Sequence, residues 1–187
     1  STVPPGTSYL LEVSFMPEFL TERNFEQDFR ETSTWIFGTS FSNLQEPLTQ
    51  LIQYSFQEGK IISNRLHFVS TQEAEMIKYF RNTFLSLKVS YCNELSQFCD
   101  LQGIDYETVR MIATEDTRIG SSHTKVPGPD GKKGFGGTCF PKDTAGLLHE
   151  MTQAGMQAPV LAAVIHRNET LDRPEKDWEA DKGRSVV

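Results

Sequence analysis

Apolar residues along the chain recur mostly at helical spacing, and only three short runs are typical of strands. We predict brief strands at residues 9–15, 35–39 and 65–70, with a polar helix between the first two. Between the second and third runs, residues 46–56 carry apolar side chains every three or four positions, which predicts an amphipathic helix that stops at Gly59.

The strongest helical signal covers residues 71–101. Ser70 and Glu73 form the Ser-x-x-Glu capping box that starts a helix, and Gly103 follows the last periodic residue. About 30 residues give a helix about 45 Å long, which exceeds the width of a small domain. Its apolar stripe is more than one small partner could bury, so we predict a symmetric homodimer through helix 71–101. The stripe comprises Ile77, Phe80, Phe84, Leu85, Cys92, Leu95, Phe98 and Cys99.

Shorter helices and one long loop follow. Asp105 is placed to cap a helix that ends near residue 112. Residues 114–133 then lack periodicity, and a connection of about 20 residues without structure is typical of a binding loop or lid.

Two further helices are predicted near the C-terminus. Asp143 is expected to cap a helix that ends near residue 154, and Pro159 fits the first turn of a helix over residues 158–171. The tail from residue 172 is charged, so we expect it to be loosely held.

Composition fits one globular domain, or one domain with an appendage. The 187 residues are 37% hydrophobic and 23% charged, and no apolar run approaches the roughly 20 residues that span a bilayer. The net charge of −7 offers no basic face to a nucleic acid, so we expect neither a nucleic-acid nor a membrane partner. Three cysteines without a paired framework favour a reducing, cytoplasmic compartment. The start lacks both a signal peptide and an initiator Met, and reads like the middle of a longer protein.

The candidate chemistry centres on Cys139, in the segment GFGGTCFPKD at residues 134–143. Its glycines let the backbone bend sharply and let a ligand approach, and the nearby Lys142 favours the thiolate, which is the reactive form. The plain alternative is a free thiol in a turn. Cys92 and Cys99 lie seven residues apart on the long helix and are predicted to be buried, inert side chains.

Two pairs of polar residues are weaker candidates by themselves. Lys78 and Asn82 lie one helical turn apart, which also fits a solvated helix face. Glu18 and Glu22 share that spacing after a strand end, where carboxylates also complement a helix dipole. The four histidines lie in unrelated segments, so no metal site is expected. The dinucleotide fingerprint Gly-x-Gly-x-x-Gly is absent from these 187 residues.

Five motifs in order resemble one enzyme family. They are STVP at residues 1–4, PEFLTE at residues 17–22, Lys78-x-x-x-Asn82, Arg118-Ile119-Gly120 and GFGGTCFPKD. Together they resemble the UDP-glucose/GDP-mannose dehydrogenase family from residue 1 to about residue 168, and most closely its members that act on UDP-glucose.

The resemblance implies a mainly α fold with a small remnant β-sheet. Residues 1–70 would be residual strands and helices of an incomplete Rossmann-type, NAD-binding α/β domain. Residues 71–171 would be a central domain like that of 6-phosphogluconate dehydrogenase, with a long dimerisation helix and the cysteine loop, and residues 172–187 would be a tail. The Gly-rich NAD-binding half and a second nucleotide-sugar domain would be missing, so the isolated chain is expected not to turn over.

The implied reaction oxidises the primary alcohol of UDP-glucose to the carboxylate of UDP-glucuronate and passes two hydrides to two NAD molecules. Cys139 would be the nucleophile that forms a thiohemiacetal and then a thioester. Lys78 and Asn82 would hold the oxyanion, and Asp143 and Thr2 would position a water. Glu18 and Glu22 would be the acid/base and water-orienting carboxylates.

The resemblance also implies binding residues. Those for the nucleotide sugar would be Glu18, Phe19, Leu20, Glu22, Lys78, Asn82, Arg118, Phe135 and Gly136. Those for NAD would be Ser1, Thr2, Val3, Glu22 and Lys142.

Three alternatives remain open at this point. The sugar nucleotide could be GDP-mannose. The chain could be a non-catalytic helical dimerisation or binding module derived from this family. A cysteine hydrolase would need a histidine within reach of Cys139, and none is evident nearby in the sequence.

Overall fold

The computed structural model describes residues 13–20 and 24–180. The chain divides into two compact units, residues 1–78 and 79–187, and the division falls inside the long helix α3 (Thr71–Gln102). The functional division into residues 1–70, 71–171 and 172–187 stays a prediction. Ser1, Thr2, Val3 and Glu22 lie outside the described residues, as do residues 9–12 of the first predicted strand.

The first unit contains a two-stranded parallel sheet. Strand β1 (Trp35–Gly38) pairs with β2 (Leu66–Val69), with Trp35 opposite Leu66, so the strands predicted at residues 35–39 and 65–70 are confirmed. At the end of the first predicted run, Phe15 forms an antiparallel bridge to Gly38. The helices of this unit are α1 (Phe25–Arg30), η1 (Ser42–Leu44) and α2 (Gln45–Gln57).

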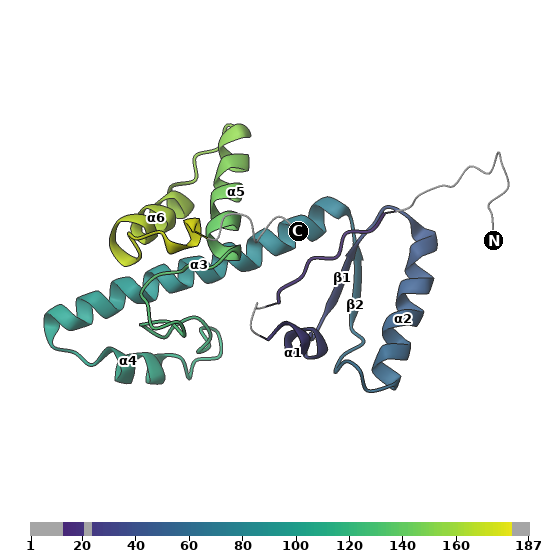
Figure 1. The fold of residues 1–187 in the computed structure, drawn as a ribbon, viewed down its shortest axis with the longest axis horizontal. Coiled ribbons are helices and arrows are strands. Elements are labelled where there is room, and N and C mark those ends of the chain that lie inside the picture. The colour runs from purple at the N-terminus through teal and green to yellow at the C-terminus, as the bar shows by residue number, and fades with distance from the viewer. Residues whose placement is uncertain (1–12, 21–23, 181–187) are drawn as a thin grey trace. The chain divides into compact units, whose positions relative to one another are not determined.

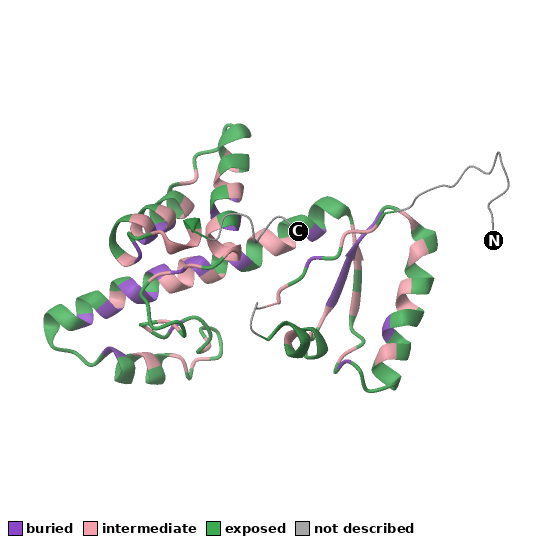
Figure 2. Ribbon diagram, in the orientation of Figure 1, coloured by how far each residue is buried: buried purple, intermediate pink, exposed green. Residues whose placement is uncertain are grey.

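A small apolar core holds that sheet to α2. Trp35 and Phe37 from β1 pack with Ile52 of α2 and with Ile61, and all four side chains are buried. The indole N–H of Trp35 donates to the carbonyl of Ser63 at 2.8 Å, so the buried ring leaves no polar group unsatisfied. Figure 2 shows that β1 is buried along its length, whereas α2 is buried on one side only.

Helix α3 begins and ends where the sequence predicts. The backbone N–H of Ser70 donates to the carboxylate of Glu73 at 2.8 Å and the Glu73 N–H donates back to the Ser70 hydroxyl at 3.2 Å, which completes the capping box. These hydrogen bonds from the backbone and then the side chain of Ser70 lower the pKa of Glu73. Gly103 follows the last residue of the helix.

The buried face of α3 differs from the predicted apolar stripe. Cys92 and Cys99 are buried against Tyr106, as predicted. Phe80, Phe84 and Phe98 are instead 69%, 56% and 55% exposed. Most of the other buried positions of α3 carry small polar side chains, and these are Asn82, Ser86, Ser90, Asn93 and Ser96.

The second unit is built of helices around the C-terminal part of α3. They are α4 (Tyr106–Ala113), α5 (Cys139–Gln153), α6 (Pro159–Arg167), the π-helical turn η2 (Asn168–Asp172) and the short η3 (Asp177–Glu179). Asp105 caps α4 with its carboxylate, as predicted. In Figure 1, α5 and α6 lie on one side of α3 and α4 lies on the other. No helix of the described residues is long and apolar enough to cross a bilayer.

The connection between α4 and α5 contains neither helix nor strand, as predicted, but it is anchored. The Tyr106 hydroxyl donates to the carbonyl of Thr124 at 2.7 Å, and Thr124 is 2% exposed. Burial beside Cys92 raises the pKa of Tyr106, so its hydroxyl remains a donor. The ammonium of Lys88 donates to the carbonyls of Ile119 and Gly120 at 2.8 and 3.0 Å.

Two expectations for this unit are wrong. Helix α5 begins at Cys139, so Asp143 lies inside the helix and does not cap it. The reason is Pro141, whose fixed φ and missing N–H suit the first turn of a helix. The segment after residue 172 is also not loosely held up to residue 180, because Arg173 is 5% exposed and forms ion pairs with Asp130 and Asp177.

Candidate functional site

Cys139 is the first residue of α5 and is partly buried. Its sulfur lies 3.9 Å from the hydroxyl of Thr138, the residue before the helix. Unpaired backbone N–H groups at a helix N-terminus favour negative charge there. The start of the helix thus places the sulfur where developing negative charge is stabilised, a feature that the sequence interpretation missed when it began the helix at Asp143.

One buried side chain fixes the glycine-rich loop, residues 134–137, that leads to Cys139. The backbone N–H of Phe135 donates to Oδ1 of Asn168 at 2.8 Å, and Nδ2 of Asn168 donates to the carbonyl of Phe135 at 2.9 Å. Asn168 is 1% exposed, so both buried backbone groups depend on it. From α3, the Asn93 side chain accepts the N–H of Gly134 at 3.2 Å.

Two glycines of this loop are required by their surroundings. Gly134 has a φ of 66°, and a Cβ there would lie 2.4 Å from Oδ1 of Asn168. A Cβ on Gly136 would lie 2.5 Å from Cζ of Arg173. A side chain at either position would displace the groups that hold the loop.

Asn82 and Asp143 form a buried polar pair beside the start of α5. Nδ2 of Asn82 donates to Oδ2 of Asp143 at 2.5 Å, and the two residues are 8% and 5% exposed. Lys142 places its ammonium 3.3 Å from the other oxygen of Asp143. Because Cys139 and Asp143 are four residues apart on α5, they lie on one face of that helix.

In the first unit, the structure brings together two other predicted site residues. Nζ of Lys78 lies 2.6 Å from Oε1 of Glu18, and the side chains are 20% and 45% exposed. The backbone N–H of Leu20 donates to the other oxygen of Glu18 at 3.0 Å. Phe19 and Leu20 are half-buried.

Arg118 is placed differently from the other candidates. Its side chain is 88% exposed, and it pairs with Asp116 at 2.5 Å. This hydrogen bond lowers the pKa of Asp116. Among the interactions of the described residues, none joins Arg118 to Cys139 or Asp143.

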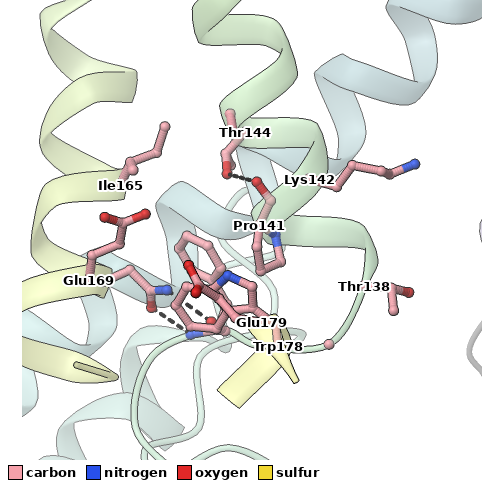
Figure 3. A pocket seen from close by; sticks show the side chains of 12 residues that line it. Thr138, Pro141, Lys142, Thr144, Ile165, Glu169, Trp178 and Glu179 are labelled. Carbon is pink, nitrogen blue, oxygen red and sulfur yellow. Dashed lines mark hydrogen bonds between the residues drawn. The ribbon is translucent and has the colours of Figure 1, made fainter. Parts of the chain in front are cut away.

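A pocket of about 350 Å³ opens beside the N-terminus of α5. Thr138, Pro141 and Lys142 line it from α5 and its cap, while Glu169, Trp178 and Glu179 line it from the C-terminal segment (Figure 3). The Thr144 hydroxyl donates to the carbonyl of Pro141 at 3.1 Å, which the same view marks. The pocket is thus lined by residues on either side of Cys139 in the sequence and by Trp178, while Cys139 itself is not among the lining residues.

Among the described residues, no hydrogen bond joins Cys139 to a histidine. The ring of His123 lies near that of Phe140, with the ring centroids 5.6 Å apart and the ring planes tilted by 45°. No three His, Cys, Asp or Glu side chains in this part of the chain gather as metal ligands would.

Sequence reasoning missed Asn168 and Arg173. Both are polar residues in a charged segment, and nothing in the local pattern marks them as buried. Trp178 is the one signal that could have revealed the packing of this segment, because a tryptophan in a charged tail usually covers something apolar.

Comparison with known proteins identifies the family of the chain. Residues 72–170 match the UDP-glucose/GDP-mannose dehydrogenase family, central domain. The chain is 35% identical over 185 residues to UDP-glucose 6-dehydrogenase of Pseudomonas aeruginosa and 32% identical over 183 residues to UDP-glucose 6-dehydrogenase TuaD of Bacillus subtilis. Each alignment covers 90% of this chain but only 39% and 37% of the relative.

The fold matches as well. A UDP-glucose dehydrogenase from the archaeon Pyrobaculum islandicum superposes with a TM-score of 0.70 at 28% identity, covering 84% of this chain and 34% of that one. The helical fold with its long central helix is therefore that of a nucleotide-sugar dehydrogenase central domain. The chain belongs to the UDP-glucose/GDP-mannose dehydrogenase family, as its motifs predicted, and it spans about two fifths of the length of the curated relatives that it matches.

Replacing Asn168 should loosen the glycine-rich loop. Asn168→Ala leaves the buried N–H and C=O of Phe135 without partners, and we expect a loss of about 2–4 kcal/mol in the free energy of unfolding. Urea titration followed by circular dichroism measures it. Thr170→Ala, which removes an exposed hydroxyl two residues away, is the control, and equal losses in the two variants would contradict the role of Asn168.

The ion pairs of Asp177 with Arg173 and Lys132 predict that the stability of the fold falls in acid. Hydrogen bonds from Arg173 and then Lys132 hold the pKa of Asp177 well below its ordinary value. A carboxyl group whose pKa is lower in the folded than in the unfolded state stabilises the fold. This stabilisation is complete above the unfolded pKa of about 3.9 and is lost as the pH falls through the folded pKa. Unfolding free energies should therefore drop between about pH 4 and pH 2, and Asp177→Asn should flatten that drop, whereas Asp100→Asn, an exposed change on α3, should not.

Proposed function

We propose that the chain is the central part of an NAD-dependent UDP-glucose 6-dehydrogenase, which converts UDP-glucose to UDP-glucuronate. The observation that carries this proposal is the placement of Cys139 at the start of α5, one turn from the buried Asp143 that Asn82 holds. A thiol at a helix N-terminus, a positioned carboxylate and an amide donor are the groups that acyl chemistry on sulfur needs.

The chemistry falls into three stages. The primary alcohol first loses a proton and a hydride and becomes an aldehyde. The sulfur of Cys139 then adds to the aldehyde carbon, and the resulting thiohemiacetal loses a second proton and hydride to give a thioester. Water finally attacks the thioester carbon, the C–S bond breaks, and the carboxylate and the free thiol are released.

The other residues act on charges and protons. Lys78 and the second N–H of Asn82 would stabilise the oxyanion that forms on the sugar oxygen. Asp143 and Thr2 would position the attacking water, and Glu18 and Glu22 would exchange protons with the substrate and with water. The 2.6 Å pair between Lys78 and Glu18 supports a shared role for these two residues.

NAD, when bound, supplies the hydride acceptor for both oxidations. Among the described residues, Lys142 would contact NAD. Its side chain is 54% exposed at the rim of the pocket beside α5, so its ammonium can pair with an anionic group of the cofactor. Ser1, Thr2, Val3 and Glu22 would add further contacts. Because the 187 residues contain no Gly-x-Gly-x-x-Gly, we propose that this polypeptide alone does not turn over.

The substrate would be held by Phe135 and Gly136 of the glycine-rich loop, with Phe19, Leu20 and Arg118. Identities of 35% and 32% to enzymes named UDP-glucose 6-dehydrogenase favour UDP-glucose over GDP-mannose. The three free cysteines support a reducing, cytoplasmic location.

Cys139→Ser tests the nucleophile. In the full-length polypeptide, UDP-glucose should drive NADH formation and GDP-mannose should not, and the substitution should lower kcat at least about a thousandfold, because a hydroxyl cannot form the thioester. Absorbance at the NADH band measures turnover. Cys99→Ala, which removes a buried thiol, is the matched control and should keep its rate. Normal turnover by Cys139→Ser, or steady NADH formation by the 187-residue chain alone, would refute the corresponding part of the proposal.

We also propose a homodimer through α3. Phe80 and Phe84 stack with their ring centroids 6.2 Å apart on an exposed face. They border an apolar cavity of about 300 Å³ that Leu147, Met151 and Val160 also line. Exposed aromatic side chains beside an apolar hollow are typical of a subunit interface.

Charge on this face should separate the subunits. Phe80→Asp combined with Phe84→Asp would bury carboxylates in the interface, so sedimentation equilibrium of the full-length variant should give the monomer mass. Tyr54→Asp, an equally drastic change at an exposed position of α2, should leave the dimer intact. A dimer that survives the double substitution would rule out this interface.

A further inference from the structure

The side chain of Arg173 lies against the glycine-rich loop and is held there by two carboxylates. Its Nε and Nη2 donate to the two carboxylate oxygens of Asp177 at 2.7 Å each, and its Nη1 donates to Asp130 at 2.6 Å. Lys132 also pairs with Asp177 at 2.6 Å. This charge cluster, Asp130, Lys132, Arg173 and Asp177, joins the residues before the loop to the segment after α6.

The guanidinium touches the loop itself. A Cβ built on Gly136 would lie 2.5, 2.7 and 2.8 Å from Cζ, Nη2 and Nε of Arg173. Three atoms of one plane at nearly equal distances mean that the flat face of the guanidinium lies against the backbone of Gly136. The backbone N–H of Arg173 also donates to the carbonyl of Asn168 at 2.8 Å, which couples it to the residue that holds Phe135.

The ion pairs of the charge cluster fix the orientation of the Arg173 guanidinium as well as stabilising the fold. Arginine presents its donors in a rigid planar fork, and here two carboxylates fix the orientation of that plane. Lysine could keep the charge but could not provide a flat surface beneath Gly136. The loop continues through Gly137 and Thr138 directly into Cys139, so its backbone sets where α5 and the sulfur begin.

We propose that Arg173 is a positioning residue, whose guanidinium plane sets the backbone of Gly136 and through it the place of Cys139. The part that concerns catalysis rests on the proposed function. The part that concerns the loop does not.

Arg173→Lys in the full-length polypeptide tests both parts, with Arg110→Lys as the matched control, since Arg110 forms its ion pair with Glu107 elsewhere in the same unit. Hydrogen exchange of the peptide that covers residues 133–139 should rise in Arg173→Lys and stay unchanged in the control. We expect kcat per folded molecule to fall at least about tenfold, because a small displacement of a reacting group slows the chemical step steeply. KM for UDP-glucose should change less than kcat.

Each outcome decides a part of the proposal. Exchange and kcat equal to those of Arg110→Lys would overturn it. Raised exchange with unchanged kcat would leave Arg173 a purely structural residue and overturn the positioning role. Normal turnover by Cys139→Ser would overturn the proposed function instead, while raised exchange in Arg173→Lys would still support its hold on the loop.

A second substitution tests the contact directly. Gly136→Ala alone should raise exchange of residues 133–139, because its Cβ collides with the guanidinium. Added to Arg173→Lys, it should raise exchange by less than it does alone, and strictly additive effects would contradict the contact. Should Arg173→Lys fold poorly, Asp130→Asn removes one anchor of the guanidinium and should raise the same exchange to a smaller extent, whereas unchanged exchange would count against the proposal.

Discussion

The carboxamide of Asn168 is the interaction on which the candidate site depends. It pairs with both the N–H and the C=O of Phe135 in a place that water does not reach. Neither backbone group has another partner among the described residues, so displacing the carboxamide would leave both groups buried without a hydrogen bond. The need for glycine at residue 134 follows from that pairing, and the loop that it holds leads directly into α5 and Cys139.

The second constraint is the distribution of side chains on helix α3, which differs from that of an ordinary amphipathic helix. Its buried face carries mostly small polar side chains, and its three phenylalanines Phe80, Phe84 and Phe98 are exposed. Ser86 satisfies its hydroxyl by donating to the carbonyl of Asn82 at 2.7 Å, and Asn93 donates in the same way to Val89. Small residues let α5 and the glycine-rich loop come close to α3, and Asn82 and Asn93 then supply the hydrogen bonds that hold them. The exposed aromatic face supports the proposed dimer.

Local signals in the sequence predicted much of the fold. The capping box at Ser70, the cap at Asp105 and the two paired strands are local features, and they are where the sequence places them. The start of α5 was misplaced because two residues could serve as its beginning, and the first-turn preference of Pro141 outweighed the capping preference of Asp143. Five motifs in order, that of Cys139 among them, predicted the family, but the helix-end position of the sulfur came only from the structure.

The supporting residues could not be predicted because their partners are distant in sequence. Asn168 lies 33 residues from Phe135, and Arg173 lies 43 residues from Asp130. Polar side chains in a charged segment are predicted to be exposed to solvent unless the fold that buries them is known. The predicted loose tail is therefore an integral part of the site up to residue 180.

The central claim is that Cys139 carries the sugar as a thioester. Mass spectrometry of the full-length Asp143→Asn variant, quenched after mixing with UDP-glucose and NAD, tests it most directly, since that change slows the proposed attack of water. The account predicts an acyl adduct on the peptide that contains Cys139 and its release by hydroxylamine. Oxidation of UDP-glucose without an adduct on that peptide, or with the adduct on another residue, would contradict the account.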